Sequence, residues 1–189
     1  CWGHSEAMAV VAVYSVKGGV GKTTLAANLA WSSATLGGHR TLLWDLDAAG
    51  GAAFLTGVDV KRKKRAEGIF ARERDPASLI RPTAWPGLDV LPADESLWAL
   101  DRQLTSIGKK RRLAKIADGL SKAYPRIVLD CPPVLNEVSA QVLRAADLVV
   151  VPLPPSPLSS RAFELVAEAV RDTGKGHPPM LPVLSMIDR

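Results

Sequence analysis

The apolar residues of this chain fall into two patterns: short continuous runs, and longer segments with helical spacing. The run AVVAVYSV at residues 9–16 is almost entirely apolar and rich in β-branched residues. Such a run is typical of a strand that is buried on both faces. In residues 24–36 the apolar positions recur at helical spacing, and Gly37-Gly38 follows. This segment therefore predicts a helix with a glycine stop signal at its end.

The same two patterns predict the remaining elements. Further strands are predicted at residues 40–46, 88–91, 126–130, 147–152 and 182–187. Further helices are predicted around 76–80, in one or two pieces over 94–120, at 136–146 and at 159–172. Buried strands that alternate with helices indicate a single α/β domain, a three-layer sandwich with a mainly parallel central sheet. In such sheets ligands bind at the carboxyl ends of the strands.

A glycine-rich loop, KGGVGKTT, joins the first predicted strand to the first predicted helix. The usual phosphate-loop pattern, G-x-x-x-x-G-K-[ST], requires a glycine where this chain has Val16. The chemistry is nonetheless complete, because the loop's glycines let backbone N–H groups turn toward phosphate oxygens and a helix N-terminus follows. These glycines are Gly18, Gly19 and Gly21. Lys22 is expected to contact the β- and γ-phosphates, and the Thr23 hydroxyl is expected to bind Mg²⁺.

The loop also resembles the deviant Walker A motif of the ParA/MinD family of ATPases, with Lys17 as its signature lysine. The resemblance implies a P-loop NTPase fold of the SIMIBI type and a nucleotide-dependent homodimer. In that family the signature lysine reaches across the interface to the partner's phosphates, so ATP binding holds the dimer together and hydrolysis releases it. The expected nucleotide-binding residues are Lys17, Gly18, Gly19, Val20, Gly21, Lys22, Thr23 and Thr24.

Two acidic motifs extend this resemblance. LLWDLDAAG at residues 42–50 is similar to the family's second motif, which usually reads DLDPQG. It implies that Asp45 holds Mg²⁺ through water and that Asp47 orients or activates the attacking water. With Lys17 and Lys22, Asp47 completes the expected catalytic set. The AAG in place of PQG is expected to loosen the loop after Asp47.

The second acidic motif is IVLDCPP at residues 127–133, which resembles the Walker B strand and its continuation. It implies that Asp130 holds the water shell of the metal, so that Thr23, Asp45 and Asp130 form the metal site. Residues 131–138 are expected to act as a switch segment.

The likeness covers residues 8–189 and includes the stretches 90–104 and 149–166. Members of the family usually continue beyond the last predicted strand, so the C-terminal end of the family domain is expected to be missing from this chain. Residues 1–7 are expected to be the remnant of a tag in front of a natural start at Met8.

Basic residues are concentrated in two runs, and the formal net charge is +5. The runs lie at residues 61–65 and 109–112. They are either ordinary solvated surface or a surface for polyphosphates, which means nucleic acid or an anionic membrane. Arg161 and Arg171 are an alternative source of such contacts.

Several classes of function are disfavoured by what the chain lacks. No apolar run approaches the roughly 20 residues that span a bilayer, and the start of the chain has no signal-peptide pattern. Cys131 is the only internal cysteine. A single cysteine favours a reducing cytosol without a disulfide and excludes a cluster-bearing enzyme similar to the nitrogenase iron protein. Cys131 itself is expected to be inert.

The hypothesis favoured by the signature lysine is a cytoplasmic ParA-like partitioning ATPase, nucleoid-associated when bound to ATP. It would use ATP and Mg²⁺, bind DNA non-specifically and respond to a ParB-like or other activating partner protein. A MinD-like membrane-cycling ATPase remains the alternative, with a C-terminal amphipathic helix as its discriminating feature. A small-molecule ligase or kinase of related fold would need an acceptor pocket, for which the sequence has no motif.

Overall fold

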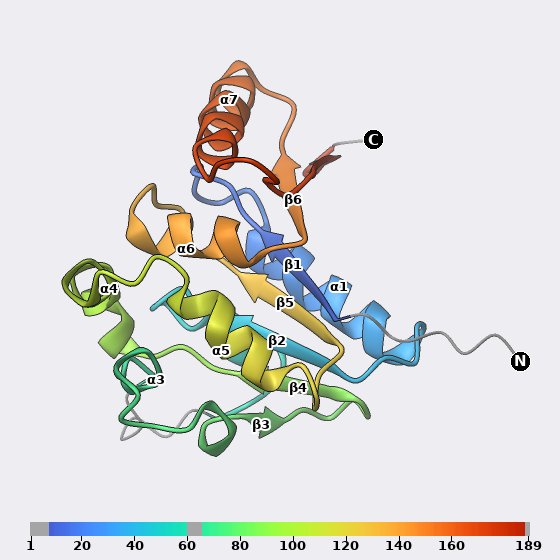
Figure 1. The fold of residues 1–189 in the computed structure, drawn as a ribbon. Helices are drawn as coiled ribbons and strands as arrows, with labels where there is room; N and C mark the ends of the chain where they lie inside the picture. The colour runs from blue at the N-terminus through green and yellow to red at the C-terminus, as the bar shows by residue number, and fades with distance from the viewer. Residues whose placement is uncertain (1–7, 60–65, 188–189) are drawn as a thin grey trace, which may run out of the picture.

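The computed structural model describes residues 8–59 and 66–187 of the chain. The described residues build a seven-stranded sheet with the order β3-β4-β2-β5-β1-β6-β7 (Figure 1). Its strands are β1 (Ala9–Val13), β2 (Thr41–Asp45), β3 (Arg81–Pro82), β4 (Leu88–Leu91), β5 (Arg126–Asp130), β6 (Leu148–Leu153) and β7 (Met180–Leu184). Neighbouring strands are parallel except β3 and β4. The first basic run lies outside the described residues.

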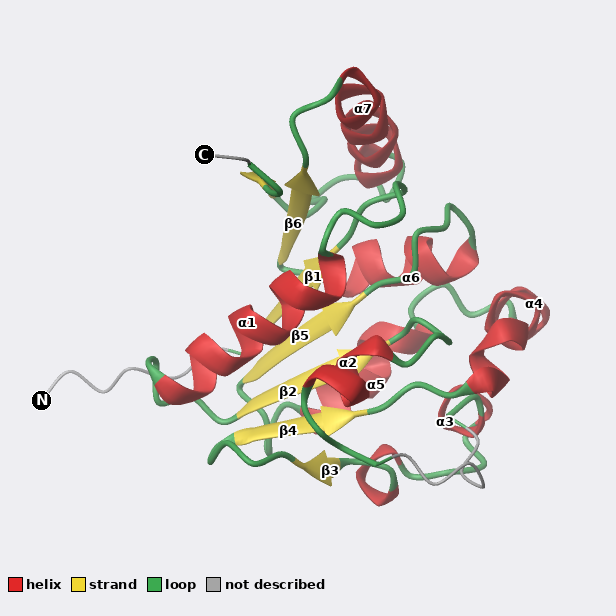
Figure 2. Ribbon diagram, turned by 180° about the vertical axis from the view of Figure 1, so that it is seen from behind, coloured by secondary structure: helices red, strands yellow, loops and turns green. Residues whose placement is uncertain are grey.

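Helices cover both faces of this sheet. On one face lie α1 (Lys22–Thr35) and α2 (Gly51–Leu55), which are in front in Figure 2. On the other face lie α3 (Gly68–Ala71), α4 (Leu100–Ile107), α5 (Arg112–Leu120), α6 (Glu137–Ala145) and α7 (Pro157–Arg171), which are in front in Figure 1. Two 3₁₀ turns, Pro76–Ser78 and Glu95–Ala99, complete the regular structure of the described residues. The predicted three-layer α/β sandwich is therefore confirmed.

Alanines hold α1 close to the sheet. Ala26, Ala30 and Ala34 are buried one turn apart, and they pack in one cluster with Leu43 and Val128. Because an alanine side chain is only a methyl group, the helix axis approaches the strands closely. This packing fixes the N-terminus of α1, and with it the end of the phosphate loop.

The opposite face carries the larger side chains. Trp44 stacks on Phe70 with the ring centroids 6.0 Å apart. Leu113 and Ile116 of α5 belong to the same buried cluster as Ile127 of β5. Apolar side chains thus bury the central strands from both sides, as their sequence predicts.

Some element boundaries differ from the prediction. The first strand ends at Val13 rather than at Val16, because the following residues already form the turn of the phosphate loop. The last strand begins at Met180, two residues earlier than predicted, and pairs in parallel with β6. The sequence did not predict α2, α3 or the antiparallel β3, all of which have five residues or fewer.

The sheet brings the ends of three strands together. In the strand register Asp45, the last residue of β2, lies opposite Asp130, the last residue of β5. Asp130 also lies opposite Val13, the last residue of β1. The phosphate loop and both carboxylates therefore meet at the carboxyl edge of the sheet. No helix of the described residues is long and apolar enough to span a bilayer.

Candidate functional site

The phosphate loop encloses open space. Gly19 and Gly21 have φ angles of 69° and 84°, a backbone region that side chains other than glycine rarely adopt. A Cβ atom added at Gly18, Gly19 or Gly21 would meet no atom within 4 Å. The loop therefore has room for a group that approaches its backbone closely, as phosphate oxygens do.

Lys22 carries the buried cation of the loop. The residue is only 7% exposed, and its Nζ donates to the carbonyl oxygen of Lys17 at 3.2 Å. Burial lowers its pKa, while the nearby carboxylates of Asp130 and Asp47 oppose that change. A partly desolvated ammonium next to an open loop is well suited to phosphate oxygens, because its attraction for them is screened less than in water.

Asp45 is a buried carboxylate with two backbone donors. Its Oδ1 accepts from the N–H of Asp47 and its Oδ2 from the N–H of Ala52, each at 3.0 Å. Burial, together with the neighbouring Asp130, raises the pKa of Asp45 to about 7. Its hydrogen bonds join β2 to the start of α2, so Asp45 orders the segment that carries Asp47.

Asp130, the last residue of β5, is a buried carboxylate. Both of its carboxylate oxygens are buried, and neither has a partner within the part of the chain that the structure describes. Burial raises the pKa of Asp130 to about 6, and the neighbouring Thr23 hydroxyl and Lys22 ammonium counteract this rise. A buried carboxylate that lacks donors is unfavourable by itself. A cation, or the water molecules around one, would satisfy it.

The predicted metal residues fit Mg²⁺ only with additional ligands. Within residues 8–59 and 66–187 no three His, Cys, Asp or Glu side chains converge on a common metal position. Mg²⁺ keeps several waters and commonly uses one or two carboxylates together with substrate phosphates. The unpartnered oxygens of Asp130 and the nearby Thr23 hydroxyl suit that mode, with Asp45 further fixed by its backbone donors.

The turn after Asp47, which the AAG sequence is expected to loosen, contains two local hydrogen bonds. The side chain of Asp47 accepts from the N–H of Ala49 at 3.0 Å, and its carbonyl oxygen accepts from the N–H of Gly50 at 2.9 Å. Gly51 begins α2 directly against Thr23: a Cβ atom at Gly51 would lie 3.1 Å from Thr23 Cγ2 and 3.5 Å from Thr23 Oγ1. The residues after Asp47 are thus in contact with the start of α1, which carries Thr23.

Lys17 is held within its own chain. Its Nζ donates to Ser156 Oγ at 3.1 Å and to Ser159 Oγ at 3.4 Å, and these two hydroxyls lie 2.9 Å apart. Both serines belong to the start of α7, far from the loop in sequence. The side chain of the second lysine of the loop is therefore bonded to the start of α7.

The other predicted residues of the loop occupy different environments. Val20 is 1% exposed, and its carbonyl oxygen accepts from Ser185 Oγ at 3.2 Å. Thr24 is exposed in the first turn of α1, where its carbonyl oxygen accepts from Asn28 Nδ2 at 2.8 Å. The loop is thus bonded at Val20 to the residue that follows β7, while a Cβ atom at its glycines would meet nothing.

The predicted switch segment is connected directly to the loop strand. Tyr14, which follows β1, donates its hydroxyl to the carbonyl oxygen of Val134 at 2.6 Å. Cys131 is 1% exposed, and burial raises the pKa of its thiol far above the usual value. A buried, protonated thiol is a poor nucleophile, which agrees with the inert role expected for Cys131.

Sequence reasoning missed Ser156, Ser159, Tyr14 and Gly51 as parts of the site. The signal for the serines was weak: the segment SPLS places two hydroxyls three positions apart at a helix start, which alone indicates only capping. Their contact with Lys17 depends on the fold.

Comparisons with known proteins agree with this geometry. A family model described as an AAA domain matches residues 8–178. Chromosome partitioning protein ParA of Caulobacter vibrioides is 36% identical over 152 residues, covering 76% of this chain and 55% of that protein. Sporulation initiation inhibitor protein Soj of Bacillus subtilis is 33% identical over 146 residues, covering 76% of this chain and 57% of that protein. The chain belongs to the ParA-like family of P-loop ATPases.

A solved structure extends the likeness to the fold of this ParA-like chain. Cobyrinic acid a,c-diamide synthase from Mycobacterium smegmatis, solved with a bound ATP analog and magnesium, superposes with a TM-score of 0.84 at 28% identity. The match covers 94% of this chain and 74% of that one. The family and fold expected from the loop motif are thereby confirmed. The chain spans just over half the length of the two curated relatives, 55% and 57%.

The contact between α2 and Thr23 gives a first prediction. Gly51→Ala is expected to weaken Mg²⁺-dependent nucleotide binding roughly fivefold, because crowding at the 3.1 Å contact displaces Thr23 at a cost of about 1 kcal/mol. Calorimetric titration with and without Mg²⁺ measures the effect. Gly119→Ala in α5 is the matched control, because a Cβ there meets nothing within 4 Å. Equal nucleotide affinities for Gly51→Ala and the wild-type chain in Mg²⁺ would contradict the assignment of Thr23 to the metal site.

Proposed function

We propose that this chain is a ParA-like ATPase that binds ATP with Mg²⁺, dimerises in the ATP-bound state and binds DNA without sequence preference. Hydrolysis of ATP to ADP and phosphate then releases the dimer and the DNA. The cycle partitions or positions a chromosome, a plasmid or a protein cargo in the cytoplasm, with the ATP-bound form on the nucleoid. A ParB-like or other activating protein stimulates hydrolysis.

One observation carries this proposal: the loop has two lysines that serve different partners. Lys22 is buried beside Asp130, whose carboxylate has no donor among the described residues. Lys17 lies at the rim of the site on the two serines of α7. A single ATP-binding site needs only the first cation. The second is available for another molecule, and in a symmetric dimer that molecule is the nucleotide of the partner.

Each residue has a separate part in the proposed reaction. Lys22 and the loop N–H groups bind the phosphates, and Thr23, Asp45 and Asp130 hold Mg²⁺ directly or through water. The metal neutralises charge that develops on the phosphate oxygens. Asp47 orients the attacking water, because it lies near Asp130 and Lys22 and its backbone is fixed by the turn through Gly50.

Lys17→Ala is expected to leave nucleotide affinity in the monomer within about twofold of the wild-type value while ATP-dependent dimers disappear, since within its own chain the ammonium is bonded to the serines of α7 and its proposed phosphate contact lies across the dimer. Light scattering with ATP and with ADP gives the oligomeric state, and calorimetry gives the affinity. Lys22→Ala serves as the contrast, because it is expected to abolish nucleotide binding. If Lys17→Ala still forms ATP-dependent dimers, the role given to the second lysine is wrong.

Asp47→Asn is expected to keep ATP binding and dimerisation but to slow phosphate release by roughly a hundredfold or more, because the amide is a poor acceptor for the water proton. Asparagine retains an oxygen for the Ala49 N–H, so the turn persists. A single-turnover assay of phosphate release measures the effect. Unchanged release would assign water activation to another residue.

The serines of α7 give a fourth prediction. Ser159→Ala removes one acceptor of Lys17 and is expected to increase the ATP-dependent dimer fraction several-fold at a fixed protein concentration, since a hydrogen bond to a charged group contributes about 1.5 kcal/mol. Ser160→Ala, an exposed neighbour, is the matched control. Sedimentation of both variants over a protein titration measures dimerisation. A weaker dimer in Ser159→Ala would mean that Ser159 stabilises the ATP-bound form instead.

The proposal as a whole is tested by binding of a labelled duplex with ATP, with ADP and without nucleotide, next to a co-sedimentation assay with anionic vesicles. DNA binding that requires ATP supports it. Vesicle binding without DNA binding would assign the chain to the membrane-cycling alternative.

A further inference from the structure

A cluster of basic residues surrounds the start of α5, on the helical face away from α1. The cluster, called the basic rim, consists of Arg72, Lys109, Lys110, Arg111, Arg112 and Lys115. It lines three neighbouring depressions of about 510, 300 and 270 Å³, and all three share Arg72 and Arg112. No acidic side chain lines the two smaller depressions. Among the described residues, no rim cation forms an ion pair.

Arg112 is a structural residue of the rim, whereas both readings of the basic run, as solvated surface or as a surface for polyphosphates, placed all of residues 109–112 at the surface. It is 6% exposed, and it donates from Nε to the carbonyl oxygen of Phe70 at 2.7 Å and from Nη2 to that of Ile69 at 3.4 Å. These bonds join α3 to α5. The three exposed residues of the run, Lys109, Lys110 and Arg111, are left to face solvent.

Arg72 approaches Arg112 in a strained backbone conformation. Its φ angle is 66° at the C-terminal end of α3, where glycine is the usual residue. Burial and the neighbouring Arg72 guanidinium lower the pKa of Arg112. Glu73 and Asp75 line the largest depression, but the two smaller ones have no acidic side chain, so two guanidinium groups that repel each other there suit a polyanion that screens both charges.

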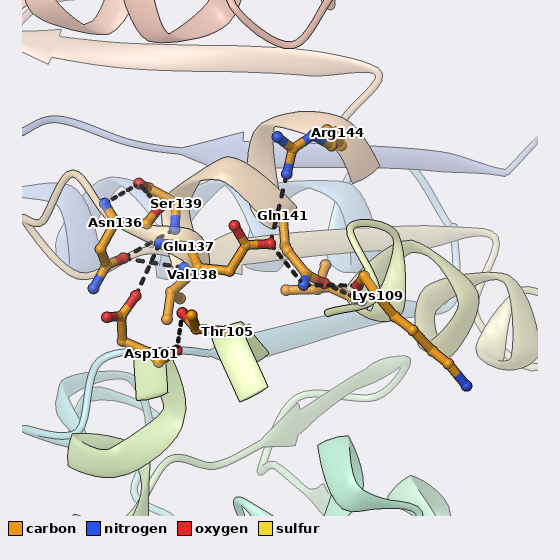
Figure 3. A network of polar contacts seen from close by, with 10 residues as sticks. Asp101, Thr105, Lys109, Asn136, Glu137, Val138, Ser139, Gln141 and Arg144 are labelled. Atoms are coloured by element: carbon orange, nitrogen blue, oxygen red, sulfur yellow. Dashed lines mark hydrogen bonds and ion pairs between the residues drawn. The ribbon is translucent and has the colours of Figure 1, made fainter. Parts of the chain in front are cut away.

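Gln141 of α6 holds both ends of the basic run (Figure 3). It is fully buried, and its Nε2 donates to the carbonyl oxygen of Lys109 at 3.0 Å. Its Oε1 accepts from the N–H of Leu113, also at 3.0 Å. The same Nε2 donates to Glu137 Oε1 at 3.0 Å. One side chain thus ties the backbone before and after the exposed cations to the start of α6.

The start of α6 continues directly from the predicted switch segment. Asn136 caps the helix by accepting from the N–H groups of Val138 and Ser139, and Asp101 of α4 accepts from the N–H of Glu137 at 2.8 Å (Figure 3). Seven residues before Glu137 is Asp130, whose carboxylate has no donor within the described part of the chain. A shift of residues 131–136 when Asp130 gains a cation would therefore move Gln141 and, with it, the basic run.

We propose that the basic rim binds the phosphodiester backbone of DNA, and that Gln141 makes this binding depend on the nucleotide site. The inference rests on the proposed function and names its DNA surface and the route of control. DNA is favoured over a membrane because the large apolar side chains that are exposed lie outside the rim, so nothing in it inserts into lipid. The cations of the rim surround separate depressions, and each depression can take a single phosphate group.

Lys110→Ala with Arg111→Ala tests the surface, because both residues are exposed and take no part in the nucleotide site. Anisotropy of a labelled mixed-sequence duplex in ATP is expected to show an affinity lower by on the order of tenfold or more, and a salt slope smaller by about two. The matched control is Lys122→Ala with Lys175→Ala, two exposed cations outside the rim. Nucleotide binding and dimerisation are expected to stay unchanged in both double variants.

Gln141→Met tests whether Gln141 couples the rim to the nucleotide site, since methionine is of similar size and cannot form the three hydrogen bonds. The ratio of DNA affinity in ATP to that in ADP is expected to fall toward one, with nucleotide affinity unchanged. Hydrogen exchange of the wild-type chain provides a measurement that does not depend on a variant's folding. Amides of residues 109–113 are expected to exchange at different rates with an ATP analog and with ADP, and equal rates would overturn the coupling.

The outcomes separate the two proposals. If the wild-type chain binds no duplex with any nucleotide, the proposed function and the rim both fail. If it binds in ATP and the Lys110→Ala, Arg111→Ala variant binds equally well, only the rim is wrong. Loss of vesicle binding in this variant, without DNA binding by the wild-type chain, would make the rim a lipid surface and overturn the assignment to DNA.

Discussion

The structure depends on one unfavourable arrangement: a carboxylate, Asp130, buried at the end of the central strand β5 with no donor among the described residues. Burying such a group destabilises the empty fold. A ligand that supplies a cation or its water shell removes this cost, so binding and stability are linked at that position. The strand register forces the arrangement, because it places Asp45 opposite Asp130 and the phosphate loop beside both. Lys22 offsets the charge only in part, and burial lowers its own pKa.

Much of the fold could be predicted from the sequence because the central strands are buried on both faces, which requires long apolar runs such as AVVAV in β1. The phosphate loop could be predicted because glycines with positive φ have few substitutes. The short elements could not. Two of the four residues of α3, Ile69 and Phe70, accept hydrogen bonds from the distant Arg112, and the two residues of β3 pair with β4. Such elements depend on tertiary contacts rather than on local pattern.

Charge was the least reliable guide, since a run of like charges does not reveal which members face inward. Residues 109–112 read as one exposed surface, but Arg112 turns into the protein and fastens α3. This inward turn gives the run its position, because a buried arginine bonded to backbone carbonyls holds the following helix while its neighbours remain free. Gln141, which no motif singles out, also fixes the run, because its side chain bonds to the backbone of Lys109 and Leu113. Within this run, a residue that holds the fold thus follows directly after residues that face solvent.

The same reasoning applies to Lys17. Its ammonium has two hydroxyl partners in its own chain, so a move toward a second molecule competes with these two hydrogen bonds. Serine hydroxyls are neutral, whereas a triphosphate is strongly anionic, so the ammonium prefers the phosphate when one is in reach. The serines therefore weaken the contact of Lys17 with a phosphate but do not prevent it. With carboxylates in their place the lysine would be retained too strongly, and without acceptors it would be free before any nucleotide arrived. Neutral acceptors at this position suit a contact between Lys17 and a phosphate that forms and breaks once in each round of the proposed ATPase cycle.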